Sequence, residues 1–145
     1  MSGSRQTIRV LVVDDSVDAA NGLAAVLSLA DYEARAAYDG LSALKVATSF
    51  RPHLVLLDIE MPGMDGYATA RRLRQMTPDA PQVLVAYTAN TDSGLVAATT
   101  RAGFDLRVGK PCEIPELLQL LERAVSRLKH ESAAAPARSR RRANG

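Results

Sequence analysis

The chain has 145 residues, of which 47% are hydrophobic and 23% are charged, a composition typical of one globular domain. The formal net charge of +2 is uneven, because four arginines near the carboxyl terminus (Arg138, Arg140, Arg141 and Arg142) leave 14 basic against 16 acidic residues elsewhere. An acidic body with 4% aromatic residues argues against a nucleic-acid surface. No apolar run approaches the roughly 18 residues of a membrane span, and the single Cys112 fits a reducing, cytoplasmic compartment.

Two strand–helix units are expected in the first third of the chain. The apolar run Ile8–Val13 predicts a strand, and Ser16 or Asp18 can begin the helix that follows it. Small and apolar residues recur along this helix at helical spacing, at Ala20, Leu23, Ala24, Leu27 and Ala30.

The second unit has a weaker strand pattern. The run Glu33–Tyr38 contains Arg35, which indicates an edge strand. A helix is then expected from Asp39-Gly40 to Phe50, where Arg51-Pro52 ends it. The residues expected on its buried side are Leu41, Leu44 and Ala47 or Thr48.

The run Leu54–Asp58 is the most informative strand pattern in the sequence. Four consecutive apolar residues without alternation indicate a strand buried on both faces, as in a parallel sheet. A Pro/Gly-rich turn follows Asp58, and a helix is expected over Asp65–Met76. Three arginines are expected on the solvent side of that helix: Arg71, Arg72 and Arg74.

The last third of the chain predicts two more strands and two more helices. The strands are expected at Gln82–Thr88 and Phe104–Val108, and a weak helix over Thr91–Ala102 lies between them, with Gly103 as its carboxyl-terminal cap. The final helix, Glu113–Lys129, has the clearest amphipathic pattern, carried by Leu117, Leu118, Leu121, Val125 and Leu128.

This pattern divides the chain into three parts. Residues 1–7 are expected to be an amino-terminal extension, residues 8–130 the domain, and residues 131–145 a basic, disordered tail. Five strands that alternate with five helices predict an α/β fold with right-handed crossovers. The expected arrangement is a flavodoxin-like, doubly wound parallel sheet in the order 2-1-3-4-5.

That strand order predicts where the polar residues at strand ends meet. The first and third strands become neighbours, so Asp14, Asp15 and Asp58 converge at one carboxyl edge. Three such carboxylates need a cation, and oxygen ligands favour Mg²⁺. Thr88 and Lys110 end the next two strands and add a hydroxyl group and an ammonium group. This set suits phosphoryl transfer, with Asp58 as the nucleophile.

On these residues the sequence resembles the receiver domain of two-component response regulators, the family typified by the small chemotaxis regulator. The resemblance runs from about Ile8 to Leu128. It is carried by four motifs that stand in order at predicted strand ends: Val12-Val13-Asp14-Asp15, Leu57-Asp58-Ile59-Glu60-Met61-Pro62-Gly63-Met64-Asp65-Gly66, Tyr87-Thr88-Ala89 and Lys110-Pro111.

The resemblance implies a role for each carboxylate. Asp58 would accept a phosphoryl group from a phosphohistidine on a sensor histidine kinase or a histidine phosphotransfer protein. Asp15 and Asp58 would bind Mg²⁺ directly, Asp14 would act through water, and the backbone carbonyl group of Glu60 would complete the metal shell.

The resemblance also implies how the phosphoryl group is held and sensed. Thr88, Lys110 and the backbone amide of Ala89 would bind its oxygen atoms. In the family an aromatic residue three positions before the lysine moves with the hydroxyl residue, but here that position is Arg107. Because a guanidinium is costly to bury unpaired, we expect Arg107 to stay at the surface. Gly109 is a second departure, which would loosen the loop.

We therefore expect a phosphorylation-controlled switch rather than an enzyme, acting as a single-domain regulator or a phosphorelay intermediate. The expected partners are the phosphodonor and a downstream protein, with no specific nucleic acid or membrane, and the expected state is a monomer or weak dimer. Three alternatives stay open: a receiver piece of a hybrid histidine kinase, a pseudo-receiver that takes no phosphate, and an aspartate-nucleophile phosphohydrolase that uses Glu60 as acid/base.

Overall fold

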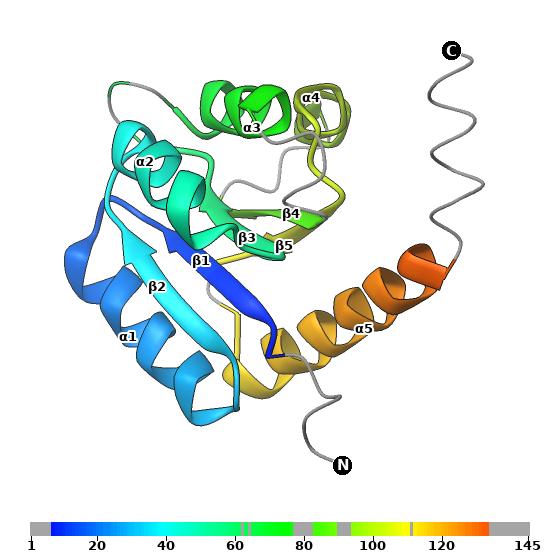
Figure 1. The fold of residues 1–145 in the computed structure, drawn as a ribbon. Helices are drawn as coiled ribbons and strands as arrows, with labels where there is room; N and C mark the ends of the chain where they lie inside the picture. Colours follow the sequence, from blue (N-terminus) through cyan, green and yellow to red (C-terminus); the bar gives the residue numbers. More distant parts are fainter. Residues whose placement is uncertain are drawn as a thin grey trace. The chain divides into compact units, whose positions relative to one another are not determined.

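A computed structural model describes residues 7–61, 63, 65–76, 83–89, 94–110 and 112–133. They belong to two compact units, Met1–Pro111 and Cys112–Gly145. The first unit contains a five-stranded parallel sheet (Figure 1). Its order, β2-β1-β3-β4-β5, is the predicted one. The strands are β1 (Arg9–Val13), β2 (Glu33–Ala37), β3 (Leu54–Asp58), β4 (Val83–Thr88) and β5 (Leu106–Gly109).

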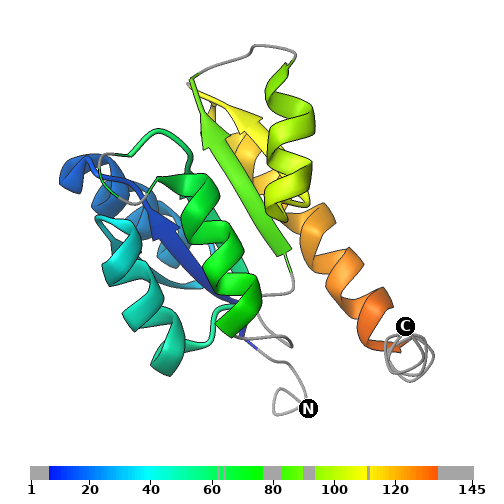
Figure 2. The ribbon, with the colours of Figure 1, turned by 90° about the horizontal axis from the view of Figure 1, so that it is seen from above.

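Helices cover both faces of this sheet, as expected for a doubly wound fold. One face carries three helices, which lie side by side in the order α2, α3, α4 (Figure 2), and α1 lies on the other face (Figure 1). Their bounds are α1 Val17–Leu29, α2 Gly40–Phe50, α3 Gly66–Met76 and α4 Gly94–Ala102. The second unit contains α5, Ile114–Ala133. Among the residues that the structure describes, no helix is long and apolar enough to cross a membrane.

One hydrophobic core cluster lies between the sheet and the helices α2, α3 and α4. Every residue of β3 is buried, as the unbroken apolar run predicted. Alternate residues of β1, β3 and β4 face the same core because side chains alternate along a strand. The core includes the strand residues Leu11, Val13, Val55, Leu57, Leu84 and Ala86 and the helix residues Ala43, Leu44, Ala47, Phe50, Ala70 and Leu73.

Side-chain oxygen atoms cap the first three helices at their amino ends. Ser16 Oγ accepts from the amide of Ala19 at 3.2 Å, Asp39 Oδ1 from Ser42 at 2.7 Å, and Asp65 Oδ1 from Ala68 at 2.9 Å. The bonds from the Ser42 amide and hydroxyl lower the pKa of Asp39. Each cap satisfies an amide that the helix itself leaves unpaired.

The predicted buried side of α2 was wrong at one position, Leu41, which is 61% exposed. Leu44 is buried as expected, and of the two alternatives Ala47 and Thr48 it is Ala47 that is buried. The residues that α2 buries are Gly40, Ala43, Leu44, Ala47 and Phe50. Two of these residues are small alanines. The buried face of the helix therefore runs along the alanine side, and Leu41 lies outside it. Close packing of small side chains against the sheet, and not hydrophobicity alone, therefore decides which face of α2 is buried.

The expectation of a solvent-facing Arg74 was also wrong. Its Nη2 atom lies 2.5 Å from Asp105 Oδ2 and 2.8 Å from the Gly103 carbonyl oxygen. Gly103 closes α4 at φ +105°, as predicted for a capping glycine. The same Asp105 Oδ2 accepts from the Leu84 amide at 2.8 Å. This contact joins α3 to β4 and to the loop that leads into β5.

Element ends differ from the predictions by a few residues. The strand β5 begins at Leu106 rather than Phe104, because the amide of Phe104 still bonds to Thr99 of α4 at 3.0 Å. The helix α5 begins at Ile114 and continues to Ala133, beyond the expected Lys129. The expected starts at Gln82 and Thr91, the Leu128 side chain and residues 134–145 lie outside the described residues. The domain boundaries after residues 7 and 130 stay predictions.

We predict opposite effects from adding one methyl group at two glycines. A Cβ atom at Gly22, within α1, meets no atom within 4 Å, so Gly22→Ala should raise the free energy of unfolding by about 0.5–1 kcal/mol. A Cβ atom at Gly66 would lie 2.5 Å from Ile59 Cα and 2.6 Å from the Asp58 carbonyl oxygen, so Gly66→Ala should lower it by about 1–3 kcal/mol. Urea unfolding measures both values, and equal changes would contradict this account.

We also predict that His53 makes stability depend on pH. The backbone amide of Arg9 donates to His53 Nδ1 at 2.9 Å, which requires a neutral ring. Burial, with the charge of Arg9, lowers the pKa of His53 below its ordinary value of 6.5. As the pH falls below 6.5, His53 takes up a proton more readily in the unfolded chain than in the folded one. The free energy of unfolding therefore decreases.

His53→Asn is the matched control, because an amide oxygen can accept the same bond without titrating. Urea unfolding at about pH 7.5 and about pH 5.5 should show a larger loss of stability in the wild type than in the variant. Equal losses would mean that His53 has the same pKa in the folded and unfolded states.

Candidate functional site

Three carboxylates meet at the carboxyl edge of the sheet. Oxygen atoms of Asp14, Asp15 and Asp58 all lie within 4.8 Å of one another. Asp14 follows β1 and Asp58 ends β3, and these strands pair directly. Asp14 and Asp58 are each 4% exposed, and Asp15 is exposed. The convergence expected from the strand order is therefore present.

The backbone fixes the two buried carboxylates in the same way. Asp14 Oδ1 accepts from the amide of Ser16, and Asp58 Oδ1 accepts from the amide of Glu60, each at 3.0 Å. In both cases the donor stands two residues after the aspartate, a local turn that aspartate favours. Each carboxylate thus keeps its second oxygen, Oδ2, for other contacts.

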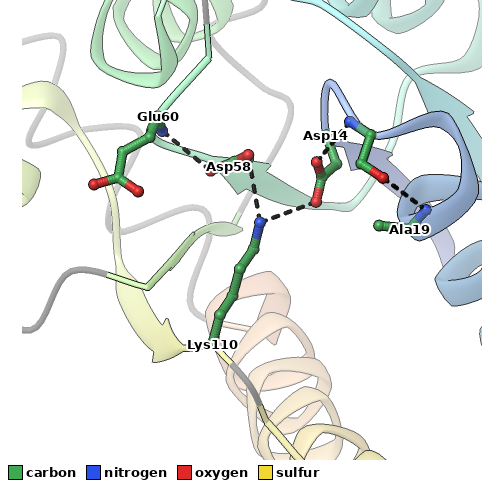
Figure 3. Close-up of polar contacts among 6 residues, drawn as sticks. Asp14, Ala19, Asp58, Glu60 and Lys110 are labelled. Carbon is green, nitrogen blue, oxygen red and sulfur yellow. Dashed lines mark hydrogen bonds and ion pairs between the residues drawn. The ribbon is translucent and has the colours of Figure 1, made fainter.

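Lys110 joins those two remaining oxygen atoms (Figure 3). Its Nζ atom lies 3.0 Å from Asp14 Oδ2 and 3.3 Å from Asp58 Oδ2. The lysine backbone is anchored by its amide, which donates to the Thr88 carbonyl oxygen at 2.8 Å. The contacts therefore connect the ends of β1, β3 and β4 with the residue after β5.

Burial and charge act against each other at this site. Burial raises the pKa of Asp58, and the Glu60 amide and the Lys110 charge only partly oppose it. Burial lowers the pKa of Lys110, but the hydrogen bond that its ammonium donates to Asp14 and the charge of Asp58 outweigh burial, so the pKa is raised. The lysine stays charged, yet one ammonium cannot balance three carboxylates. The remaining negative charge suits a divalent cation.

The other expected site residues stand at the ends of β3 and β4, two strands that pair directly. Thr88 is fully buried at the end of β4, and Ala89 follows it at the surface. Glu60 is exposed, and its carboxylate points away from Asp58 (Figure 3). Its contribution to the cluster is therefore the backbone amide that holds Asp58.

Arg107 lies on the opposite face of the sheet from the carboxylates. It pairs with Ala86, a core residue on the α2–α4 side, and it is exposed, as expected. Burial raises the pKa of Tyr67 in α3, with further raising by Asp65 and Glu60, while the Arg107 charge lowers it. Arg107 is therefore placed on the face of the sheet that α2, α3 and α4 cover, and not on the face of Asp58.

One residue beside Lys110, Tyr87, was not among the site residues expected from the sequence. The Lys110 Nζ atom lies 4.9 Å from the centre of the Tyr87 ring. In the sequence Tyr87 stands only as part of the motif Tyr87-Thr88-Ala89, without a role of its own. Its pairing with Asp58 in the expected sheet was the available signal.

We predict that Lys110 stabilises the folded domain by separating two buried carboxylates. Lys110→Met should lower the free energy of unfolding by about 1–3 kcal/mol, because Asp14 and Asp58 then face each other without a cation. Asp58→Asn in the Lys110→Met background should recover part of that loss. A double-mutant cycle from urea unfolding measures the coupling, and additive effects would contradict it.

The comparisons with known proteins agree with this site. A family model described as the response regulator receiver domain matches residues 10–122. Response regulator MprA of Mycobacterium tuberculosis is 37% identical over 128 residues, which cover 88% of this chain and 55% of the relative. Transcriptional regulatory protein PrrA of the same species is 38% identical over 110 residues, which cover 76% of this chain and 46% of that relative. The chain spans about half the length of these curated relatives.

Solved structures show the same fold. The chemotaxis protein CheY4 of Vibrio cholerae superposes with a TM-score of 0.77 at 27% identity, covering 81% of this chain and 98% of that one. NtrX of Brucella abortus superposes with a TM-score of 0.77 at 31% identity, covering 88% of this chain and 29% of the NtrX chain. The chain thus belongs to the response regulator receiver domains of two-component systems.

Proposed function

We propose that this receiver domain accepts a phosphoryl group on Asp58 from a phosphohistidine, in a Mg²⁺-dependent reaction that changes a surface read by another protein. The observation that carries the proposal is the setting of Asp58. Its carboxylate is buried at the end of β3, and Lys110 Nζ lies 3.3 Å from its Oδ2. A carboxylate that is shielded from water and close to a cation suits nucleophilic attack on a phosphoryl group.

The donor atoms at this edge fit Mg²⁺. The cluster of Asp14, Asp15 and Asp58 consists of carboxylates only, and Mg²⁺ prefers oxygen ligands together with water. We propose Asp15, Asp58 and the backbone carbonyl group of Glu60 as direct ligands, with Asp14 acting through water. When bound, the ion would neutralise charge on the phosphoryl oxygens.

In the proposed transfer, an Asp58 oxygen forms a bond to phosphorus as the phosphorus–nitrogen bond of the donor breaks. The electron pair of that bond leaves with the imidazole of the donor. Lys110, the Thr88 hydroxyl and the Ala89 amide would donate to the phosphoryl oxygens. The domain would act by holding charges and donors in place, and it would be modified once rather than turn over free substrates.

The proposed partners are proteins. The phosphodonor would be a sensor histidine kinase or a histidine phosphotransfer protein, and a downstream protein would read the modified surface. The description of PrrA as a transcriptional regulator belongs to a relative about twice as long. For this domain we propose no specific nucleic acid or membrane partner, a monomer or weak dimer, and a cytoplasmic location.

Two other functions have weaker support. A phosphohydrolase would need Glu60 to act on a leaving group beside Asp58, but the Glu60 carboxylate points away (Figure 3). A pseudo-receiver is favoured only by Arg107, which lies on the opposite face of the sheet.

We predict that a small acyl phosphate adds one phosphoryl group to the wild-type protein in the presence of Mg²⁺. Intact-mass measurement should show one adduct, which disappears in Asp58→Asn or without Mg²⁺. Asp65→Asn is the matched control, because the Asp65 carboxylate caps α3 and is not one of the three clustered carboxylates, and it should retain the adduct.

An adduct that persists in Asp58→Asn would place the acceptor elsewhere. No adduct in the wild type, with Mg²⁺ binding verified by calorimetry, would favour the pseudo-receiver. Repeated turnover of free acyl phosphate or another phosphoester, many times per protein molecule, would favour the phosphohydrolase.

A further inference from the structure

The ring of Tyr87 is a third group in contact with the Lys110 ammonium, beside the carboxylates of Asp14 and Asp58. The ammonium lies 4.9 Å from the ring centre, within the range in which a cation is attracted to an aromatic face. Its other two partners are carboxylate oxygens, at 3.0 Å on Asp14 and 3.3 Å on Asp58. The lysine head group thus lies among two anions and one aromatic ring.

The register of the sheet explains why Tyr87 stands there. Asp58 pairs with Tyr87, and Tyr87 pairs with Val108, so the three side chains project from the same face. Lys110 stands two residues after Val108, beyond Gly109. The Tyr87 ring therefore lies between the strand that carries the acceptor and the segment that carries the lysine.

The contact matters because a lysine side chain is long and flexible. Its four-carbon stem ends in a compact charge that can take many positions, and the side chain is 27% exposed. The ammonium is already nearer to Asp14 than to Asp58. A half-buried ring attracts the ammonium and also reduces the space into which it could swing.

We propose that Tyr87 is a positioning residue that holds the Lys110 ammonium beside Asp58, where it meets the incoming phosphoryl group. This inference rests on the proposed phosphorylation of Asp58 and adds to it a residue outside the set named above. In this proposal the ring acts through the lysine, the contact that the structure shows.

The first test compares rates of phosphorylation by a small acyl phosphate at saturating Mg²⁺, followed by intact mass. Tyr87→Leu keeps apolar bulk but removes the aromatic face, and it should slow the reaction about threefold to tenfold. Tyr87→Phe keeps the face and should react within about twofold of the wild type. The proposal would be overturned if Tyr87→Phe and Tyr87→Leu were both phosphorylated at the same rate as the wild type.

The second test separates positioning from general packing. If Tyr87 acts through the lysine, Tyr87→Leu should cause no further slowing in a Lys110→Met background. Equal slowing in both backgrounds would show that the ring acts as packing alone and would overturn the proposal.

The third test does not depend on phosphorylation. The chain has four tyrosines and no tryptophan, so 3-fluorotyrosine labelling yields few ¹⁹F signals, and Tyr87→Phe identifies the one from Tyr87. Lys110→Met should shift that signal more than the signal of Tyr38, whose hydroxyl bonds to Asn21 at 2.6 Å.

These outcomes distinguish the two proposals. If the wild type forms no adduct, phosphorylation of Asp58 fails, and the ¹⁹F spectrum still decides whether the lysine lies on the ring. An unmoved Tyr87 signal in Lys110→Met would overturn the positioning role. An adduct on the wild type together with that unmoved signal would leave phosphorylation standing and remove Tyr87 from it.

Discussion

Negative charge at the carboxyl edge of the sheet is the constraint on which the site depends. Oxygen atoms of two buried aspartates and one exposed aspartate lie within 4.8 Å of one another, and Lys110 lies between the buried pair. Such a cluster costs free energy unless a cation relieves it. The imbalance of charge therefore suits the site to a divalent cation.

The fold tolerates this cluster because backbone geometry, rather than flexible side chains, fixes its parts. The amides of Ser16 and Glu60 hold the two buried carboxylates, and the amide of Lys110 bonds across to β4. Beneath them, β3 is buried along its whole length. Near the amino end of β4, the contact between Arg74 and Asp105 ties α3 to the β4–β5 region. The buried strands and the charged edge of the sheet are thus parts of the same elements.

Much of this arrangement was predictable because it follows from strong local patterns. Unbroken apolar runs ended in carboxylates, and their alternation with helices left one common sheet order. The errors came where local patterns carry no information about neighbours. Leu41 was expected inside on hydrophobicity, yet the alanines of α2 pack closer to the sheet. Arg74 was expected in solvent because nothing in α3 indicates that the α4–β5 loop lies alongside it.

For this protein the sequence alone determined the order of the elements, the family resemblance and the carboxylates that meet. These depend on the periods of strand and helix and on the rule that parallel strands end at one edge. Only the tertiary structure decided the distances at which Lys110 lies from Asp14 and Asp58, and that its ammonium also meets the ring of Tyr87. Those contacts join residues far apart in the chain, and their geometry is set by the register and twist of the whole sheet.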